Sequence, residues 1–165
     1  HVLETGHEVR VQEHPAATMR GVLEDRDRDR LVSQAIHRLG DDGRTVLVLT
    51  SLVDHAESLA AKVGGAALVG TVSAKRRQAV LDSVRATQLA DEGLALPEVD
   101  AVVLAAPSSH KPATRQRIGR ACRALEGKRP PVVVDVVDSG QWAVRKWSAR
   151  RSLYRSLGWT IRRRT

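Results

Sequence analysis

The segment Val46-Leu47-Val48-Leu49-Thr50-Ser51 decides the fold of this chain. A continuous apolar run ends at two hydroxyl residues, which is typical of a short strand buried on both faces of a parallel sheet. Further apolar runs of the same kind follow at residues 66–69, 101–104 and 132–134. We therefore predict that these four apolar runs are strands of one parallel sheet.

Helical patterns alternate with these runs, at residues 29–39, 54–63, 74–85 and 112–125. Gly64 and Gly65 follow the second of these patterns directly and mark its end. Strands that alternate with helices predict right-handed crossovers and an α/β layered fold. Residues 1–20, in which Val9 and Val11 alternate, are predicted to form a lead-in hairpin or linker.

Composition excludes several classes of protein. The 165 residues fit one domain, and 42% hydrophobic with 28% charged residues is ordinary for a globular chain. No apolar run is long enough to span a membrane, and no secretory signal is present, so we expect a cytoplasmic protein without membrane contact. Cys122 is the single cysteine, and the histidines show no metal-ligand spacing. We expect no metal site in the chain itself.

A second decisive stretch is Gln116-Arg117-Ile118-Gly119-Arg120-Ala121-Cys122-Arg123. Arg120 and Arg123 are three residues apart and share a helix face, where like charges repel each other. A guanidinium offers a planar fork of donors that matches phosphate oxygens, so the pair suits a triphosphate. The alternative is a solvated basic helix face.

The order of the motifs carries a resemblance. Upstream of the arginine segment stand Ala86-Thr87, then Glu92-Gly93-Leu94 and Pro97, and then the apolar run near residue 101. This order resembles the second RecA-like domain of superfamily 2 helicases. The tail, with residues 136–140, an arginine-rich helix and residues 154–159, looks like the ending of phage and repair helicases of the DEAD/DEAH type. The segment 46–51, followed by His55 and Leu59, looks like motif IV of that family. The resemblance covers roughly residues 20–138.

The resemblance implies a fold and a division of the chain. The fold is a RecA-like parallel sheet flanked by helices, with a basic helical extension at the C-terminus. The implied parts are the lead-in segment 1–20, a RecA-like helicase C-terminal domain over 21–138, and a basic aromatic helical tail over 139–165.

The resemblance also implies the activity, which is that of one motor domain of an ATP-dependent helicase or translocase. ATP with Mg²⁺ is held mainly by a first RecA-like domain, because this chain has no phosphate-binding G-x-x-x-x-G-K-[ST] loop. The isolated chain is then expected to be inactive. Its implied partners are that first domain and DNA or RNA.

Individual residues take roles from the same resemblance. Arg120 and Arg123 correspond to the arginine fingers, which neutralise charge on the transferred phosphoryl group. The implied positions beside the nucleotide and the first domain are Gln116, Arg117, Glu92 and Gly93. The implied donors to nucleic-acid phosphates are Thr50, Ser51 and Thr87.

Two departures from the family pattern stand out. Ala95 replaces the acidic residue that follows Gly-Leu in the family, which removes one contact to the nucleotide or the interdomain cleft. In addition, Ala86 follows Arg85 with no room for the strand that the family places before Ala-Thr. A missing central strand exposes unpaired sheet edges, so we expect a break or an added strand there.

The tail has its own charge pattern. Residues 145–164 carry eight basic residues and no acid, which equals the net charge of +8. All the aromatic residues stand at 142–159. Arg150, Arg151 and Arg155 are candidates for contact with a nucleic-acid backbone while the rings stack on bases. The alternative is that Trp147, Tyr154 and Leu157, at helical spacing, pack the tail onto the domain.

Two other functions compete with a helicase motor. A non-catalytic nucleic-acid-binding module that uses the basic tail explains the charge but not the motif order. A small-molecule Rossmann enzyme explains the alternation of strands and helices, yet needs a glycine-rich first turn that Thr50-Ser51-Leu52-Val53-Asp54 does not provide.

Overall fold

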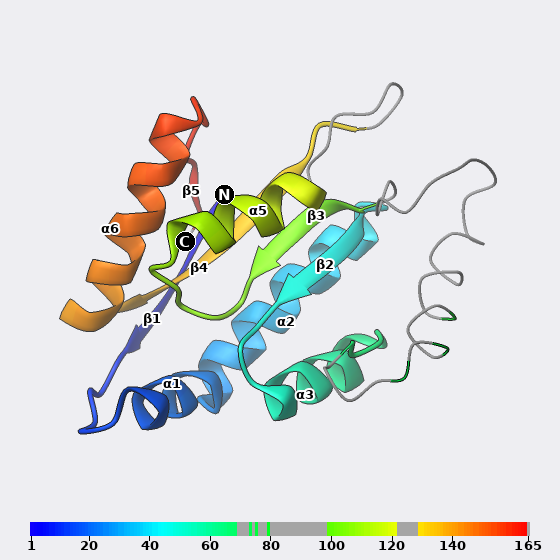
Figure 1. The fold of residues 1–165 in the computed structure, drawn as a ribbon. Coiled ribbons are helices and arrows are strands. Elements are labelled where there is room, and N and C mark those ends of the chain that lie inside the picture. The colour runs from blue at the N-terminus through cyan, green and yellow to red at the C-terminus, as the bar shows by residue number, and fades with distance from the viewer. Residues whose placement is uncertain (69–72, 74, 76–78, 80–98, 122–128, 165) are drawn as a thin grey trace.

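The structure is a computed structural model that describes residues 1–68, 73, 75, 79, 99–121 and 129–164. Figure 1 shows its elements in chain order. The helices are α1 (Pro15–Leu23), α2 (Arg26–Asp41), α3 (Val53–Val63), α5 (Lys111–Ala121) and α6 (Gln141–Ser156). The strands are β1 (Val2–Glu8), β2 (Thr45–Leu49), β3 (Val99–Leu104), β4 (Val132–Ser139) and β5 (Arg163–Arg164).

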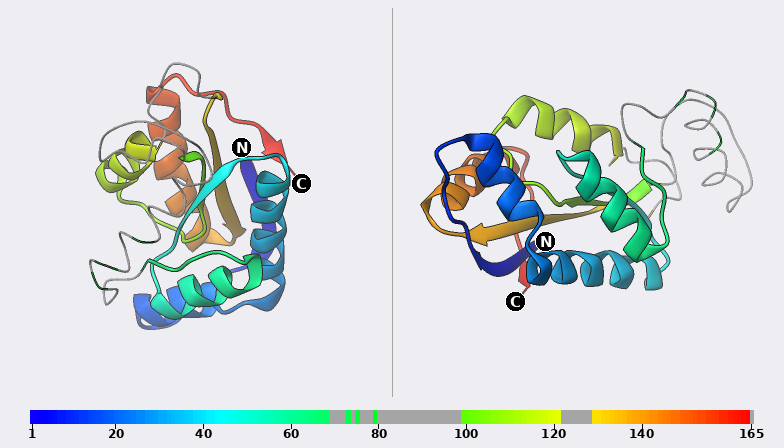
Figure 2. Two further views of the ribbon diagram at one scale, coloured as in Figure 1. Left: turned by 90° about the vertical axis from the view of Figure 1, so that its right-hand side faces the viewer. Right: turned by 90° about the horizontal axis from the view of Figure 1, so that it is seen from below.

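The strands form one parallel sheet in the order β2-β3-β4-β1-β5. Helices α2 and α3 cover one face and helices α5 and α6 the other, as the two views in Figure 2 show. Strands 46–49, 101–104 and 132–134 are confirmed; β2 and β3 are slightly longer than predicted, and β4 extends five residues further, to Ser139. The expected α/β fold with a parallel sheet is therefore present.

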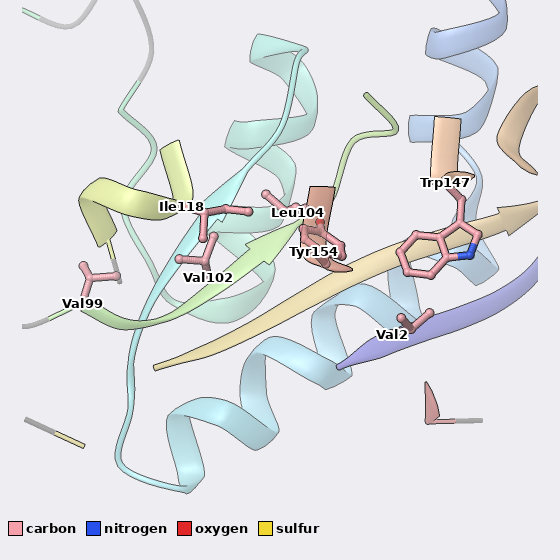
Figure 3. Packing of buried hydrophobic residues seen from close by; sticks show 7 residues of the cluster. All are labelled: Val2, Val99, Val102, Leu104, Ile118, Trp147 and Tyr154. Atoms are coloured by element: carbon pink, nitrogen blue, oxygen red, sulfur yellow. The ribbon is translucent and has the colours of Figure 1, made fainter. Parts of the chain in front are cut away.

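The core has one apolar cluster on each face of the sheet. On the α5 and α6 side, Ile118, Trp147 and Tyr154 pack against the strands, as Figure 3 shows. On the other side, Val32 and Leu59 do so from α2 and α3. The inner strand β3, between β2 and β4, is buried along its whole length because it is covered from both sides. That double cover explains why the sequence reads as a continuous apolar run instead of an alternating one.

Strand β4 interrupts its apolar run with an aspartate that anchors α6. Asp135 is 1% exposed and accepts a hydrogen bond from Arg150 Nε at 2.7 Å and another from the Tyr154 hydroxyl at 2.6 Å. Arg150 is itself 2% exposed and donates to the carbonyl oxygens of Ser108 and Val136. A buried charge is tolerated only when it is paired in this way.

A second aspartate of β4 anchors α2 on the opposite face of the sheet. Asp138 lies three residues after Asp135, and successive side chains of a strand point to alternate faces. Its carboxylate accepts from Arg28 Nε at 2.8 Å and from the Thr5 hydroxyl at 2.7 Å. Arg28 also donates to the Ala105 carbonyl, so this pair joins α2 to three strands. Each helical layer is thus fixed to β4 by one buried ion pair.

The C-terminal segment forms helix α6 over residues 141–156, as expected, but residues 163–164 form strand β5 beside β1 instead of continuing the helix. The rings of this segment serve packing. Trp147 and Tyr154 are 8% and 4% exposed, and both belong to the cluster under α6. Trp159 stacks on Tyr154 with ring centroids 5.7 Å apart. Of the two interpretations of the aromatic residues, the packing one therefore describes Trp147 and Tyr154.

At two further places, residues 2–8 and residues 66–68, the strands of the structure differ from the predicted ones. Residues 2–8 form a strand parallel to β4, so this part of the lead-in segment joins the sheet and is neither a hairpin nor a linker. Residues 66–68 form no strand, although an apolar run was predicted to be one. Leu68 is 42% exposed, so this short run lacks the burial that its composition indicated. The junction of Arg85 with Ala86 lies outside the described residues.

The end of α3 follows the prediction from its glycines. Gly64 has φ of +66°, and its amide hydrogen-bonds to the Ala60 carbonyl. A left-handed residue at this position is favourable for glycine and terminates the helix. Within the described residues, none of the helices is long and apolar enough to cross a bilayer.

The buried pair under α6 predicts a large difference between neighbouring arginines. Arg150→Ala leaves Asp135 charged and unpaired, and we expect it to lower the free energy of unfolding by about 3–5 kcal/mol. Arg151→Ala removes an exposed arginine of the same helix and should change it by less than about 0.5 kcal/mol. Urea denaturation of the two variants measures the difference. Equal midpoints would show that the pair does not anchor the helix.

Candidate functional site

The carboxyl ends of β2 and β3 lie level with each other and form the edge of interest. Leu49 pairs with Leu104, and the Ala105 amide extends the ladder by donating to the Leu49 carbonyl at 2.9 Å. Thr50 and Ser51 follow β2 at this edge, and residues 105–110 follow β3. In open parallel sheets, ligands bind in the crevice outside the carboxyl ends of the strands.

A cavity of about 350 Å³ opens at this edge. Thr50 and Ser51 line it from the β2 side, and Arg150 reaches it from α6. The loop between β3 and α5 supplies further lining residues, among them Ser108, Ser109 and His110. Three of the expected nucleic-acid contacts are thus brought to one cavity.

The Thr50 hydroxyl belongs to a buried polar chain that links three elements. His55 Nδ1 lies 2.6 Å from Thr50 Oγ1, and His55 Nε2 lies 3.5 Å from Asp29 Oδ1. The second carboxylate oxygen of Asp29 accepts from the Lys62 ammonium. His55 and Asp29 are 5% and 6% exposed, so helices α2 and α3 together hold the imidazole behind Thr50.

The charge state of His55 decides what Thr50 offers to a ligand. Burial lowers the pKa of His55; Asp29 opposes this shift, whereas the positive charges of Arg28 and Lys62 add to it. The imidazole is therefore neutral near pH 7. The facing Asp29 carboxylate favours the proton on Nε2, so Nδ1 accepts and the Thr50 hydroxyl donates to it. The outward side of Thr50 is left with acceptor lone pairs, which cannot donate to a phosphate, whereas the neighbouring Ser51 is exposed.

Helix α5 carries the arginine segment and packs on the face of the sheet that α6 also covers. Thr114 and Ile118, one turn apart, are buried against the sheet, and Gln116 is exposed. Arg117 and Arg120 lie within α5. A Cβ built on Gly119 meets no atom within 4 Å, so the described residues leave this side of α5 open.

Arg150 is too buried to contact a nucleic acid. Its guanidinium is buried and is engaged by Asp135 and by two backbone carbonyls. Phosphate binding by Arg150 would break the ion pair that anchors α6, so the expected role of this residue is wrong. Arg151 and Arg155 are exposed on the same helix, in agreement with what a phosphate contact requires.

Four of the expected site residues lie outside the described residues: Thr87, Glu92, Gly93 and Arg123. Among those that are described, sequence reasoning missed Asp29 and Ser108. Ser108 follows β3 at the carboxyl edge, and that position alone makes it a candidate. Asp29 gave no such signal, because an acidic residue in the first turn of a helix is usually a solvated partner of the helix dipole.

The polar chain behind Thr50 predicts a pH dependence of stability. Because the pKa of His55 in the folded chain lies below its ordinary 6.5, the unfolded chain binds this proton more readily. The contribution of neutral His55 is complete above pH 6.5 and is lost as the pH falls through the lower, folded-state pKa. His55→Gln should remove this component of the acid destabilisation. Melting temperatures measured from pH 8 to pH 5 test it, and parallel curves for the two proteins would contradict it.

Comparison with known proteins identifies the family of this chain. Residues 27–125 match the helicase conserved C-terminal domain. A protein of Escherichia phage T5, described as "Probable helicase D10", is 32% identical over 74 residues, which are 45% of this chain and 16% of that protein. The crystal structure of T4 UvsW superimposes with a TM-score of 0.68 at 14% identity, over 94% of this chain and 39% of UvsW. The chain therefore spans less than half of either relative. The fold is RecA-like, and the chain belongs to the helicase conserved C-terminal domain family.

Proposed function

We propose that this chain is the second motor domain of an ATP-dependent superfamily 2 helicase or translocase. The observation that carries this proposal is the family match over residues 27–125, which includes the arginine segment of α5. The phage proteins that resemble the chain are longer, and the missing length leaves room for a first domain that holds ATP with Mg²⁺.

In this proposal α5 is the element that faces the nucleotide. Its side at Gln116 and Gly119 is open among the described residues, as a surface that meets another domain requires. Arg120 and Arg123 reach the ATP of the first domain, and Gln116 and Arg117 orient them. Glu92 and Gly93 are proposed to contact the nucleotide as well. When ATP is bound in the cleft, it supplies the phosphoryl group whose developing charge the two arginines neutralise.

The nucleic acid lies, in the same proposal, across the carboxyl edge of the sheet. Ser51 and Thr87 donate to backbone phosphates, and Arg151 and Arg155 add positive charge beside them. Thr50 is not among these donors while His55 is neutral, because its hydroxyl proton is engaged by His55 Nδ1. Such backbone contacts do not distinguish base sequences, which suits an enzyme that moves along a strand.

Movement follows from differential affinity for ATP. Arg120 and Arg123 contact ATP only when the two domains are closed, so bound ATP favours closure and hydrolysis removes that preference. At the carboxyl edge, the hydrogen bond from the Ala105 amide to the Leu49 carbonyl joins the starts of the loops that follow β2 and β3. The grip on the strand therefore moves with the whole domain.

The arginine fingers give the direct test. In the full-length enzyme, Arg120→Ala or Arg123→Ala should lower ATP turnover by at least about a hundredfold while the fold stays intact. Arg30→Ala serves as a control, because Arg30 is an exposed arginine of α2, which covers the opposite face of the sheet. Steady-state ATPase rates measure the effect. Turnover near the wild-type value in both finger variants would refute their assignment.

Division of the site between two domains predicts a second result. The 165-residue chain by itself should hydrolyse no ATP and should bind the nucleotide only weakly, because it holds no phosphate loop. Calorimetric titration with ATP measures the affinity. A micromolar dissociation constant for the isolated chain would contradict the split site, and full-length protein that binds DNA without any ATPase activity would favour the binding-module alternative.

A further inference from the structure

The cavity at the carboxyl edge contains a lysine that sequence reasoning did not select. Lys146 of α6 lines it together with Thr50, Ser51 and the loop after β3. The lining side chains include the hydroxyls of Ser108 and Ser109, whereas the buried Thr114 hydroxyl donates to the His110 carbonyl. Among the described residues that line the cavity none carries a carboxylate. The formal charges on these lining residues are thus all positive.

Lys146 is held in an environment that disfavours its own charge. Partial burial lowers the pKa of its ammonium, and the neighbouring Arg150 guanidinium lowers it further. The ammonium lies 4.5 Å from the centroid of the Trp142 ring, which fixes its position by a cation–π contact without supplying a counter-charge. An anion in the cavity would reverse this penalty, since opposite charge favours the protonated lysine.

One part of the cavity wall is fixed by a buried charge. Arg150 is 2% exposed, and its Nη1 donates to the Ser108 carbonyl at 2.7 Å. This bond fixes the loop after β3 against α6 and places the Ser108 hydroxyl group beside the cavity. Asp135 neutralises Arg150 from the other side, at 2.7 Å, so among the described residues that line the cavity Lys146 is the cation without a carboxylate partner.

A helix terminus adds to the positive potential. Helix α5 begins at Lys111, directly after His110 of the cavity lining, and has no acidic residue in its first turn. The N-terminus of a helix carries a partial positive charge and unpaired amide groups, and both favour an anion. Together with Lys146 and the hydroxyls, it makes the cavity suited to a phosphate group.

We propose that this cavity is a phosphate subsite, in which Lys146 contacts a backbone phosphate of the nucleic-acid strand that also passes Thr50 and Ser51. The subsite extends the track from the loops of the RecA-like sheet onto α6, beyond the residues that match the family profile. It rests on the proposed function, because it assigns one further contact to the same nucleic-acid ligand.

Salt dependence of binding is the test. Full-length wild-type enzyme and the variants Lys146→Gln, Lys146→Arg and Arg145→Gln are titrated with labelled oligo-dT and with oligo-U at several salt concentrations. Arg145→Gln is the matched control, since Arg145 is the exposed neighbour of Lys146 on α6 and does not line the cavity. Melting temperatures verify that each variant is folded, and the KM for ATP is measured in parallel.

The expected result is a loss that is specific to the lysine charge. Lys146→Gln should weaken binding about tenfold at low salt, and the slope of log affinity against log salt should fall by about 0.7 for single strands. Lys146→Arg should keep the slope, Arg145→Gln should stay close to wild type, and the KM for ATP should not change. Both strands should show the effect, because they share the phosphate.

Other outcomes overturn the assignment. If Lys146→Gln and Arg145→Gln give the same slope as the wild type, the strand does not contact Lys146, although the proposed motor function stands. If Lys146→Gln raises the KM for ATP and leaves the salt slope unchanged, the phosphate in the cavity belongs to the nucleotide. If wild-type enzyme binds neither strand, the proposed function itself fails, and the subsite fails with it.

Discussion

The arrangement of both helical layers depends on two buried aspartates of strand β4. Asp135 pairs with Arg150 on one face of the sheet, and Asp138 pairs with Arg28 on the other. Apolar packing is largely non-directional, so the two clusters under the helices do not by themselves fix how the helices are placed along the strands. A buried ion pair fixes the position of a helix along the strands, because displacement of one partner leaves an uncompensated charge. Each arginine also reaches a carbonyl of the segment that follows β3, so the same pairs shape the edge where the candidate site lies.

Much of the fold was predictable from local pattern, and the exceptions have physical reasons. Strands β2, β3 and β4 are continuous apolar runs because the sheet is covered on both faces, and Gly64 ends α3 where its sequence position indicated. Strand β1 was missed because only Val2 and Leu3 of residues 2–8 are apolar, and its pairing with β4 joins residues more than a hundred positions apart. Residues 66–68 show the opposite error, since an apolar composition does not create a strand where burial is lacking.

The candidate site was predictable where a residue's position in the fold follows from its motif. Thr50 and Ser51 had to lie at the carboxyl edge once the preceding run was a parallel strand. Arg150 was misassigned because a basic residue among other basic residues gives no sign of burial; only Asp135, an acid within an apolar strand, indicated that a cation must pair with it. The state of the Thr50 hydroxyl was beyond sequence reasoning, because it depends on His55 and Asp29, which come from two different helices.

In the proposed motor, which pulls on a nucleic-acid strand, the parallel register of the β-sheet has a mechanical consequence. The candidate site lies at the carboxyl edge, and four of the strands run side by side from that edge through the body of the domain. A load applied there along the strand direction is shared by all the hydrogen bonds between neighbouring strands at once, because each ladder is sheared and not opened from one end. The buried arginine that ties α6 to β4 and to the loop after β3 spreads the same load into the helical layer. Tension at the edge is thereby distributed through the domain instead of being concentrated in one loop.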